Sequence, residues 1–144
     1  MTDDGGFRVM TASTTEPARG VLRAQKVTGD LAPTFADLLT GTILVRETMS
    51  PDYRVQGVVH GAARSGILAA DSHPDGGTRG IVQRAPRVGA DASLEFMRTL
   101  PHGGVAKGIV AMPDAGGVSG ALMVYLQESE QVASVIAAGA VFDG

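Results

Sequence analysis

The spacing of hydrophobic residues along the chain changes from a helical period to a strand period and back again. Apolar side chains recur every three to four residues before residue 50 and again in the stretch 118–131, whereas they alternate with polar ones in much of the region 53–112. The first spacing gathers them on one face of a helix and the second on one face of a strand. The pattern therefore predicts strands at 7–12, 53–59, 65–70, 78–83, 92–100, 106–112 and 132–142, and helices at 15–28, 32–49 and 118–131.

The predicted helices have recognisable ends. Thr14 and Thr15 offer hydroxyl groups that can cap the free N–H groups of the first helical turn. Gly29 follows that helix and marks its end. Pro51 follows the second helix and ends it, because proline disfavours helical backbone in the residue before it. In the third helix, one face is expected to be buried, namely Leu122, Tyr125, Leu126 and Ser129.

The strands of the middle region predict an antiparallel meander. The segment 71–77 (DSHPDGG) is rich in turn residues and separates two of them. The last segment, 132–142, is almost wholly apolar, which indicates a strand covered on both faces. Because the helices and strands are segregated rather than alternating, the order predicts an α+β fold.

Composition narrows the class of protein. The 144 residues, 44% of them hydrophobic, suit one domain with a sizeable core. The net charge of −3 comes without any basic run, so we expect no nucleic-acid partner. No apolar run reaches the roughly 20 residues of a membrane span, and the acidic start is unlike a signal peptide. We therefore expect a cytoplasmic protein without a membrane partner. Cysteine is absent, which excludes disulfides and thiolate metal sites within these residues.

Candidate catalytic side chains do not assemble into a known constellation. His60, His73 and His102 lie in separate predicted turns, without metal-ligand spacing. Ser65 and Ser119 lack the Gly-x-Ser-x-Gly frame and a downstream histidine of a nucleophile elbow. These residues predict no catalytic site and no metal site, so we expect no enzymatic activity.

Two further features invite a functional interpretation. The loop 114–120 (DAGGVSG) precedes a helix, but no lysine follows it, as a phosphate-binding loop requires. Glu128 and Glu130 are two residues apart on a helix and point in nearly opposite directions, so they cannot share a proton. We interpret the polar stretch 127–131 (QESEQ) as a solvated helix end.

Five strings occur in a characteristic order: FADLLTGTILV (35–45), YRVQGVVHGAARSGILAADS (53–72), TRGIVQRAP (78–86), KGIVAM (107–112) and YLQESEQVASVIAAG (125–139). In this order they resemble the N-terminal domain of the thirty-three-kilodalton heat-shock chaperone family, a group of redox-regulated bacterial holdases of the stress response. The residues that carry the resemblance are Thr15, Leu38, Leu39, Gln56, Gly57, Gly80, Tyr125, Ser129, Glu130 and Gln131.

The resemblance implies layered antiparallel β-sheets packed with helices, as a ββα three-layer sandwich. It implies binding of unfolded or partly folded proteins and a homodimer that exchanges C-terminal elements. A holdase needs exposed apolar surface, and the candidate surface is the sheet face together with part of the last segment. The residues expected there for clients or the dimer are Val132, Val135, Ile136, Val141 and Phe142.

The chain also departs from the family pattern. Gly120 and Ala121 stand where the family carries an acidic pair, and the four zinc-binding cysteines of its C-terminal module are missing. We expect residues 1–144 to be a single chaperone-like N-terminal domain, incomplete at its C-terminal end and without a zinc redox switch. Zinc is expected only if a cysteine module exists elsewhere. The alternatives are a divergent interaction or regulatory module of the same fold, and a ligand-binding protein or enzyme using 114–120.

Overall fold

The structure is a computed structural model that describes residues 6–143. Helices α1 (Thr15–Gln25) and α2 (Leu31–Thr48) come first, and helix α3 (Gly117–Ser129) follows the strands. The strands and the short helical turn η1 between the first two are β1 (Arg54–His60), η1 (Ala62–Arg64), β2 (Ile67–Ser72), β3 (Thr78–Gln83), β4 (Ser93–Thr99) and β5 (Val105–Ala111). These elements confirm the predicted α+β class.

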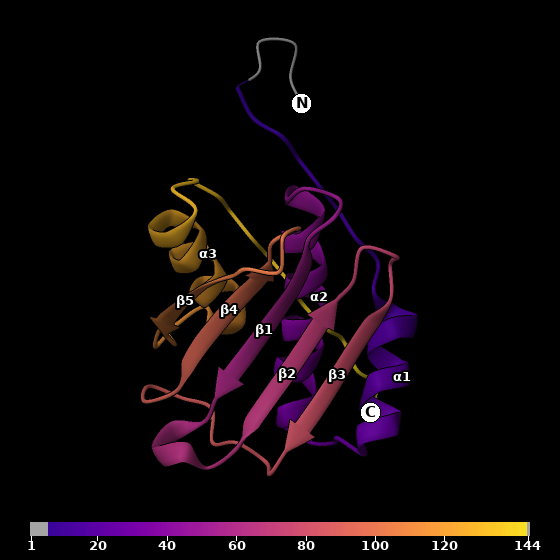
Figure 1. The fold of residues 1–144 in the computed structure, drawn as a ribbon. Helices are drawn as coiled ribbons and strands as arrows, with labels where there is room; N and C mark the ends of the chain where they lie inside the picture. Colours follow the sequence, from indigo (N-terminus) through magenta and orange to yellow (C-terminus); the bar gives the residue numbers. More distant parts are fainter. Residues whose placement is uncertain (1–5, 144) are drawn as a thin grey trace.

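The five strands form one antiparallel sheet in the order β3-β2-β1-β4-β5. The meander β1-β2-β3 is the predicted one, and β4 pairs with the other side of β1, which places β1 in the centre. Figure 1 views the sheet from its uncovered side, with all three helices behind it. The described residues therefore form two layers, one of strands and one of helices, and no second sheet lies among them.

Helix α2 is the centre of the helical layer. Phe35, Leu38 and Leu39 are fully buried, and the helix contacts strands on one side and α1 and α3 on the others. A helix that has neighbours on several sides needs apolar residues around most of its circumference. The sequence 35–45 meets that need, because only Asp37 among its eleven residues is charged.

Two glycines let the helices approach the sheet closely. A Cβ atom on Gly57 would lie 2.8 Å from Phe96 Cε2 and 2.8 Å from Thr42 Oγ1, and one on Gly80 would lie 2.8 Å from Phe35 Cζ. All three distances are shorter than van der Waals contact, so a larger residue would push α2 away from the strands. Gly57 and Gly80 thus belong to the family-like set for a packing reason.

The predicted strand at 7–12 is wrong. Residues 6–14 have no regular secondary structure, and the side chains of Phe7 and Val9 are 64% and 72% exposed. A strand exists only where another strand pairs with its backbone, and no strand lies beside this segment. The predicted capping also differs, because the Thr14 hydroxyl makes no cap and lies 2.6 Å from the Thr40 hydroxyl instead.

The predicted strand at 132–142 is also wrong. After α3 the chain continues as an irregular segment, residues 130–143, which we name the C-terminal segment. It crosses behind α2 toward α1 (Figure 1, yellow). Ile136 and Ala140, four residues apart, pack against the core, whereas Val135 and Val141 are 93% and 95% exposed. The segment is apolar because it runs over the helical layer, and it is not covered on both faces.

Candidate functional site

The sheet face turned away from the helices carries a row of mostly apolar side chains. We name it the free face, and no described helix lies on it. The strand register aligns one residue from each strand there, in the order Ile81, Ala69, Val58, Glu95 and Ile109. Val58 at the centre is only 7% exposed, whereas Ile81 and Ile109 on the two edge strands are 53% and 58% exposed. This row of mostly apolar side chains, exposed at both ends, is a candidate interaction surface.

A second, polar row runs beside the apolar row on the same face. Its aligned residues are Arg79, Asp71, Gln56, Met97 and Lys107. The family-like residue Gln56 therefore lies on the free face and not in the core. Charged groups beside an apolar strip keep the surrounding surface hydrated. The free face thus has an apolar centre with a polar margin.

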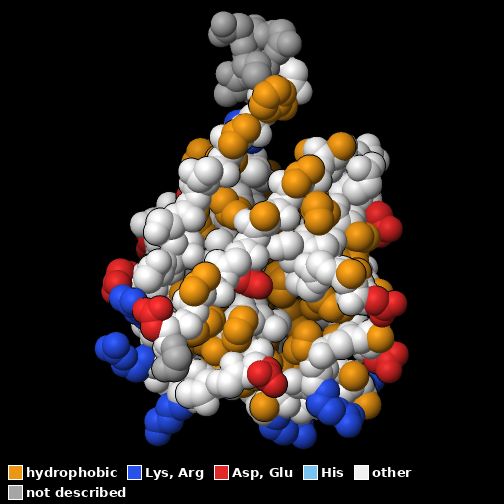
Figure 2. Space-filling view, turned by 180° about the vertical axis from the view of Figure 1, so that it is seen from behind, with side chains coloured by type: hydrophobic (Ala, Val, Ile, Leu, Met, Phe, Trp, Pro, Cys, Tyr) orange, Lys and Arg blue, Asp and Glu red, His pale blue; other side chains and the backbone are white. Residues whose placement is uncertain are grey.

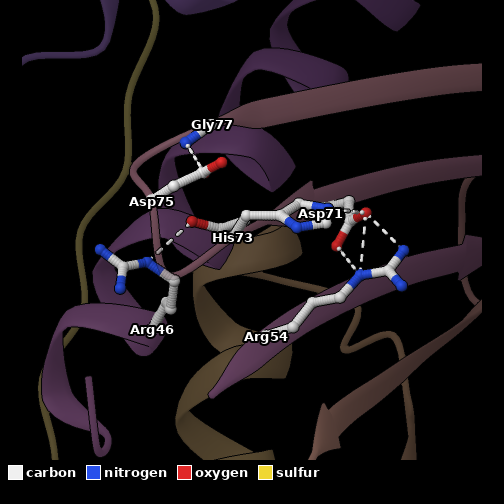
Figure 3. A network of polar contacts seen from close by, with 7 residues as sticks. Arg46, Arg54, Asp71, His73, Asp75 and Gly77 are labelled. Carbon is white, nitrogen blue, oxygen red and sulfur yellow. Dashed lines mark hydrogen bonds and ion pairs between the residues drawn. The ribbon is translucent and has the colours of Figure 1, made fainter. Parts of the chain in front are cut away.

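Asp71 anchors the polar network of this face (Figure 3). Arg54 donates to both carboxylate oxygens of Asp71 at 2.6–3.1 Å, and His73 Nε2 lies 3.0 Å from Oδ2. Burial opposes the negative charge most strongly, yet the hydrogen bonds and charges of Arg54 and His73 outweigh it and hold the pKa of Asp71 below its usual range. The network joins β1 to the turn after β2.

The lowered pKa predicts how Asp71 contributes to stability. A carboxyl group whose pKa is lower in the folded state stabilises the fold above its unfolded pKa of about 4, and that contribution disappears as the pH falls through the folded value. Asp71→Asn is expected to cost about 1 kcal/mol at pH 7 and to flatten the loss of stability below about pH 4. Urea unfolding across pH 2–7 measures this. A variant with the parent's acid dependence would contradict the assignment, and Asp75→Asn in the exposed turn is the control.

The predicted surface residues of the C-terminal segment do not form one surface. Val132 and Phe142 are about half exposed and Val135 and Val141 almost fully, while Ile136 packs against the core. The segment is held by few polar contacts: Ala138 N–H donates to Ser119 Oγ at 3.0 Å. The predicted role of these five residues in binding stays a prediction.

The helical side of the molecule is also rich in hydrophobic side chains. Figure 2 shows them gathered across the middle of this side, with Lys and Arg mainly toward its lower end. The C-terminal segment is the part of the described chain that crosses this side. Both sides of the molecule therefore present apolar groups.

The stretch 127–131 is a structural joint rather than a uniformly solvated helix end. Glu128 is exposed, but Glu130 accepts a hydrogen bond from the Tyr125 hydroxyl at 2.9 Å and one from Arg98 at 2.7 Å. Tyr125 is 2% exposed and its ring lies 5.0 Å from that of Phe96. Burial, followed by the neighbouring Glu130 carboxylate, raises the pKa of the Tyr125 phenol well above its usual range. Glu130 therefore ties α3 to β4.

The remaining family-like residues divide between the core and the surface. Leu38 and Leu39 are fully buried, while Thr15, Ser129 and Gln131 are exposed. Ser129 therefore does not belong to the buried face of α3 expected from its spacing. Gln131 has a φ of 55°, which turns the chain away from the helix axis. Sequence reasoning did not identify Arg98 as the partner of Glu130, nor Ile81 and Ile109 as exposed surface residues. The alternation of side chains along the strands was the signal that could have assigned each of them to a face.

Three of the candidate catalytic side chains, those of Ser65, Ser119 and His73, have hydrogen-bond partners in the fold. Ser65 Oγ accepts the Arg87 N–H at 2.8 Å, and Ser119 Oγ holds the C-terminal segment. His73 pairs with Asp71, and His60 Nε2 lies 3.7 Å from a Glu95 oxygen. Within residues 6–143, no group of three His, Asp or Glu side chains is placed to hold a metal ion, and no helix is both long and apolar enough to cross a membrane.

Comparisons with known proteins agree with this α+β fold. A family model described as Hsp33 protein matches residues 1–144. The structure resembles that of the 33 kDa chaperonin (heat shock protein 33 homologue) of Thermotoga maritima, with a TM-score of 0.67 and 19% sequence identity. The match covers 79% of this chain and 44% of the other, so the chain spans less than half the length of that protein. No curated protein matches the chain.

The match defines the class of protein, which is a family of heat-shock chaperones. More specifically, the chain belongs to the Hsp33 family, since the family model covers all 144 residues. The resemblance seen in the sequence is thereby confirmed, and the structural likeness adds that the fold is the same.

Proposed function

We propose that this chain is the core domain of a holdase-type chaperone that binds unfolded or partly folded proteins. The free face and the exposed part of the C-terminal segment are the proposed binding surfaces. The observation that carries the proposal is the apolar row, with Ile81 and Ile109 more than half exposed on a face that no described helix covers. Unfolded chains offer apolar side chains, and their burial against such a row is favourable by about 25 cal/mol per Å².

Aggregation of a denatured client enzyme tests the proposal. The chain is expected to suppress light scattering when a chemically denatured client is diluted into buffer at near-stoichiometric amounts. Because the 144 residues contain no cysteine, suppression is expected to be the same with dithiothreitol and with hydrogen peroxide. Unchanged scattering at a tenfold excess of the chain, under both conditions, would contradict the proposal.

The second candidate is a divergent interaction module of the same fold. Gly120 and Ala121, in place of the family's acidic pair, and the absence of cysteine favour it. Capture of one folded partner, without suppression of client aggregation, is the outcome that would select this candidate. Holdase action is expected to bind several unrelated unfolded clients instead.

A homodimer in the cytoplasm is part of the proposal. The C-terminal segment leaves Val135 and Val141 exposed and is attached through few polar contacts, and a second copy is the proposed acceptor for it. Light scattering on the same sample gives the molar mass. The proposed activity needs no cofactor from these residues, and zinc would require cysteines outside them.

A further inference from the structure

Two hollows open at one end of the sheet, between the segments 60–67 and 83–91. The larger has a volume of about 330 Å³ and includes Arg87 and Asp91 in its lining. The smaller, of about 220 Å³, is lined by His60, Gly61, Arg64, Gly66, Ile67, Gln83 and Arg84. Neither hollow has a role in the proposed holdase function.

The arginines of the two hollows have no anionic partner. Within residues 6–143, the guanidinium groups of Arg64, Arg84 and Arg87 form no ion pair and no hydrogen bond. Elsewhere in the fold, Arg54 and Arg98 pair with carboxylates. Three unpaired arginines at one end of a chain with net charge −3 make a local region of positive charge.

The backbone beneath these arginines is held in an unfavourable conformation. Arg64 and Arg84 have φ values of 55° and 50°, in the left-handed region that non-glycine residues seldom adopt. Hydrogen bonds between the two segments hold this geometry, with Ala62 N–H donating to the Arg87 carbonyl at 2.9 Å and Arg87 N–H to Ser65 Oγ. Glycine would fit both positions without strain, so a change to glycine removes the arginine side chain without disturbing the backbone there.

We propose that the smaller hollow binds a phosphate-type oxyanion between Arg64 and Arg84. A guanidinium group presents paired N–H donors that match two oxygens of a phosphate group. The volume lies below the 300–1,000 Å³ of pockets for larger organic ligands, so the site suits inorganic phosphate or the phosphate group of a small ester. His60 forms part of the wall, and its Nε2 lies 3.7 Å from a Glu95 oxygen.

Titration calorimetry with inorganic phosphate, at constant ionic strength, tests the site on the whole chain. We expect saturable binding that sodium chloride does not reproduce, and binding about tenfold weaker in Arg84→Gly and in Arg64→Gly, because each removes a charge-assisted contact. Glycine also relieves the left-handed strain, so the melting temperature without phosphate is expected to stay equal or rise. A loss of affinity is therefore not to be confused with misfolding, and unchanged affinity in both variants would contradict the proposal.

Lys26→Gly is the matched control. Lys26 has a φ of 55° at the end of α1, so this change removes one positive charge and the same backbone strain away from the hollow. We expect it to leave phosphate affinity unchanged. A parallel titration with glycerol phosphate distinguishes the two sources, since tighter binding of the ester favours a phosphorylated metabolite and tighter binding of phosphate favours the free anion. No binding of either, or equal weakening by Lys26→Gly and Arg84→Gly, would overturn the proposal.

Discussion

Replacing Ile81 and Ile109 together with lysine is expected to raise the amount of chain needed for half-suppression of client aggregation roughly tenfold or more. Each isoleucine is more than half exposed in the native fold, so the loss falls on client binding and not on the core. Burying one such side chain against a client contributes about 1.5–3 kcal/mol, which corresponds to about a tenfold change in affinity or more. Light scattering with a denatured client measures the change, and urea unfolding verifies that stability shifts by less than about 0.5 kcal/mol.

Two matched pairs of substitutions locate the binding surface. Val9→Lys with Val124→Lys adds the same charge at exposed valines outside both proposed surfaces, and suppression is expected to remain at the parent level. Val135→Lys with Val141→Lys alters only the C-terminal segment. If that pair abolishes suppression while the isoleucine pair does not, the free face is not the client surface and the C-terminal segment is.

Glu130→Ala is expected to lower the free energy of unfolding by about 2–3 kcal/mol. The change leaves the buried Tyr125 hydroxyl without its acceptor and the half-buried Arg98 guanidinium without its carboxylate. Unpaired polar groups that remain buried lose their solvation without compensation. Chemical denaturation at pH 7 measures the loss, and the same variant is expected to loosen the junction between α3 and β4.

Glu128→Ala is the control for Glu130→Ala. Glu128 lies two residues earlier, exposed on the same helix end, so its removal is expected to change stability by less than about 0.5 kcal/mol. Tyr125→Phe, which keeps the ring against Phe96, is expected to cost about 1 kcal/mol, and its effect with Glu130→Ala should be smaller than the sum of the two. Equal costs for the two glutamates, or strict additivity, would show that the hydrogen bonds do not couple α3 to β4.

Local periodicity identified the helices and the five paired strands. The predicted strand 78–83 coincides with β3, and the predicted helix 118–131 differs from α3 by one or two residues at each end. These elements are encoded by neighbouring residues, because the period of the side chains is a local property. The segments 7–12 and 132–142 were predicted as strands for the same reason, but a strand requires a partner, and the pairing of distant segments is not a local property.

The candidate site was less predictable than the elements. The family resemblance pointed to the sheet face as a candidate surface, but only the register aligns Ile81 with Ile109 across three intervening strands. It classed Glu128 and Glu130 together as a polar helix end, whereas Arg98, which lies 32 residues before Glu130, separates their roles. No pattern of spacing signals such a contact, because it depends on how α3 packs against β4.

The sequence by itself determined the family and the α+β class, because these depend on residue identity and local spacing. Only the tertiary structure decided that the last apolar segment lies over the helices, that Glu130 is a joint, and that unpaired arginines meet beside one hollow. The physical reason is the same in each case. Burial and pairing are set by residues far apart in the chain, whose approach is decided by packing of the whole fold.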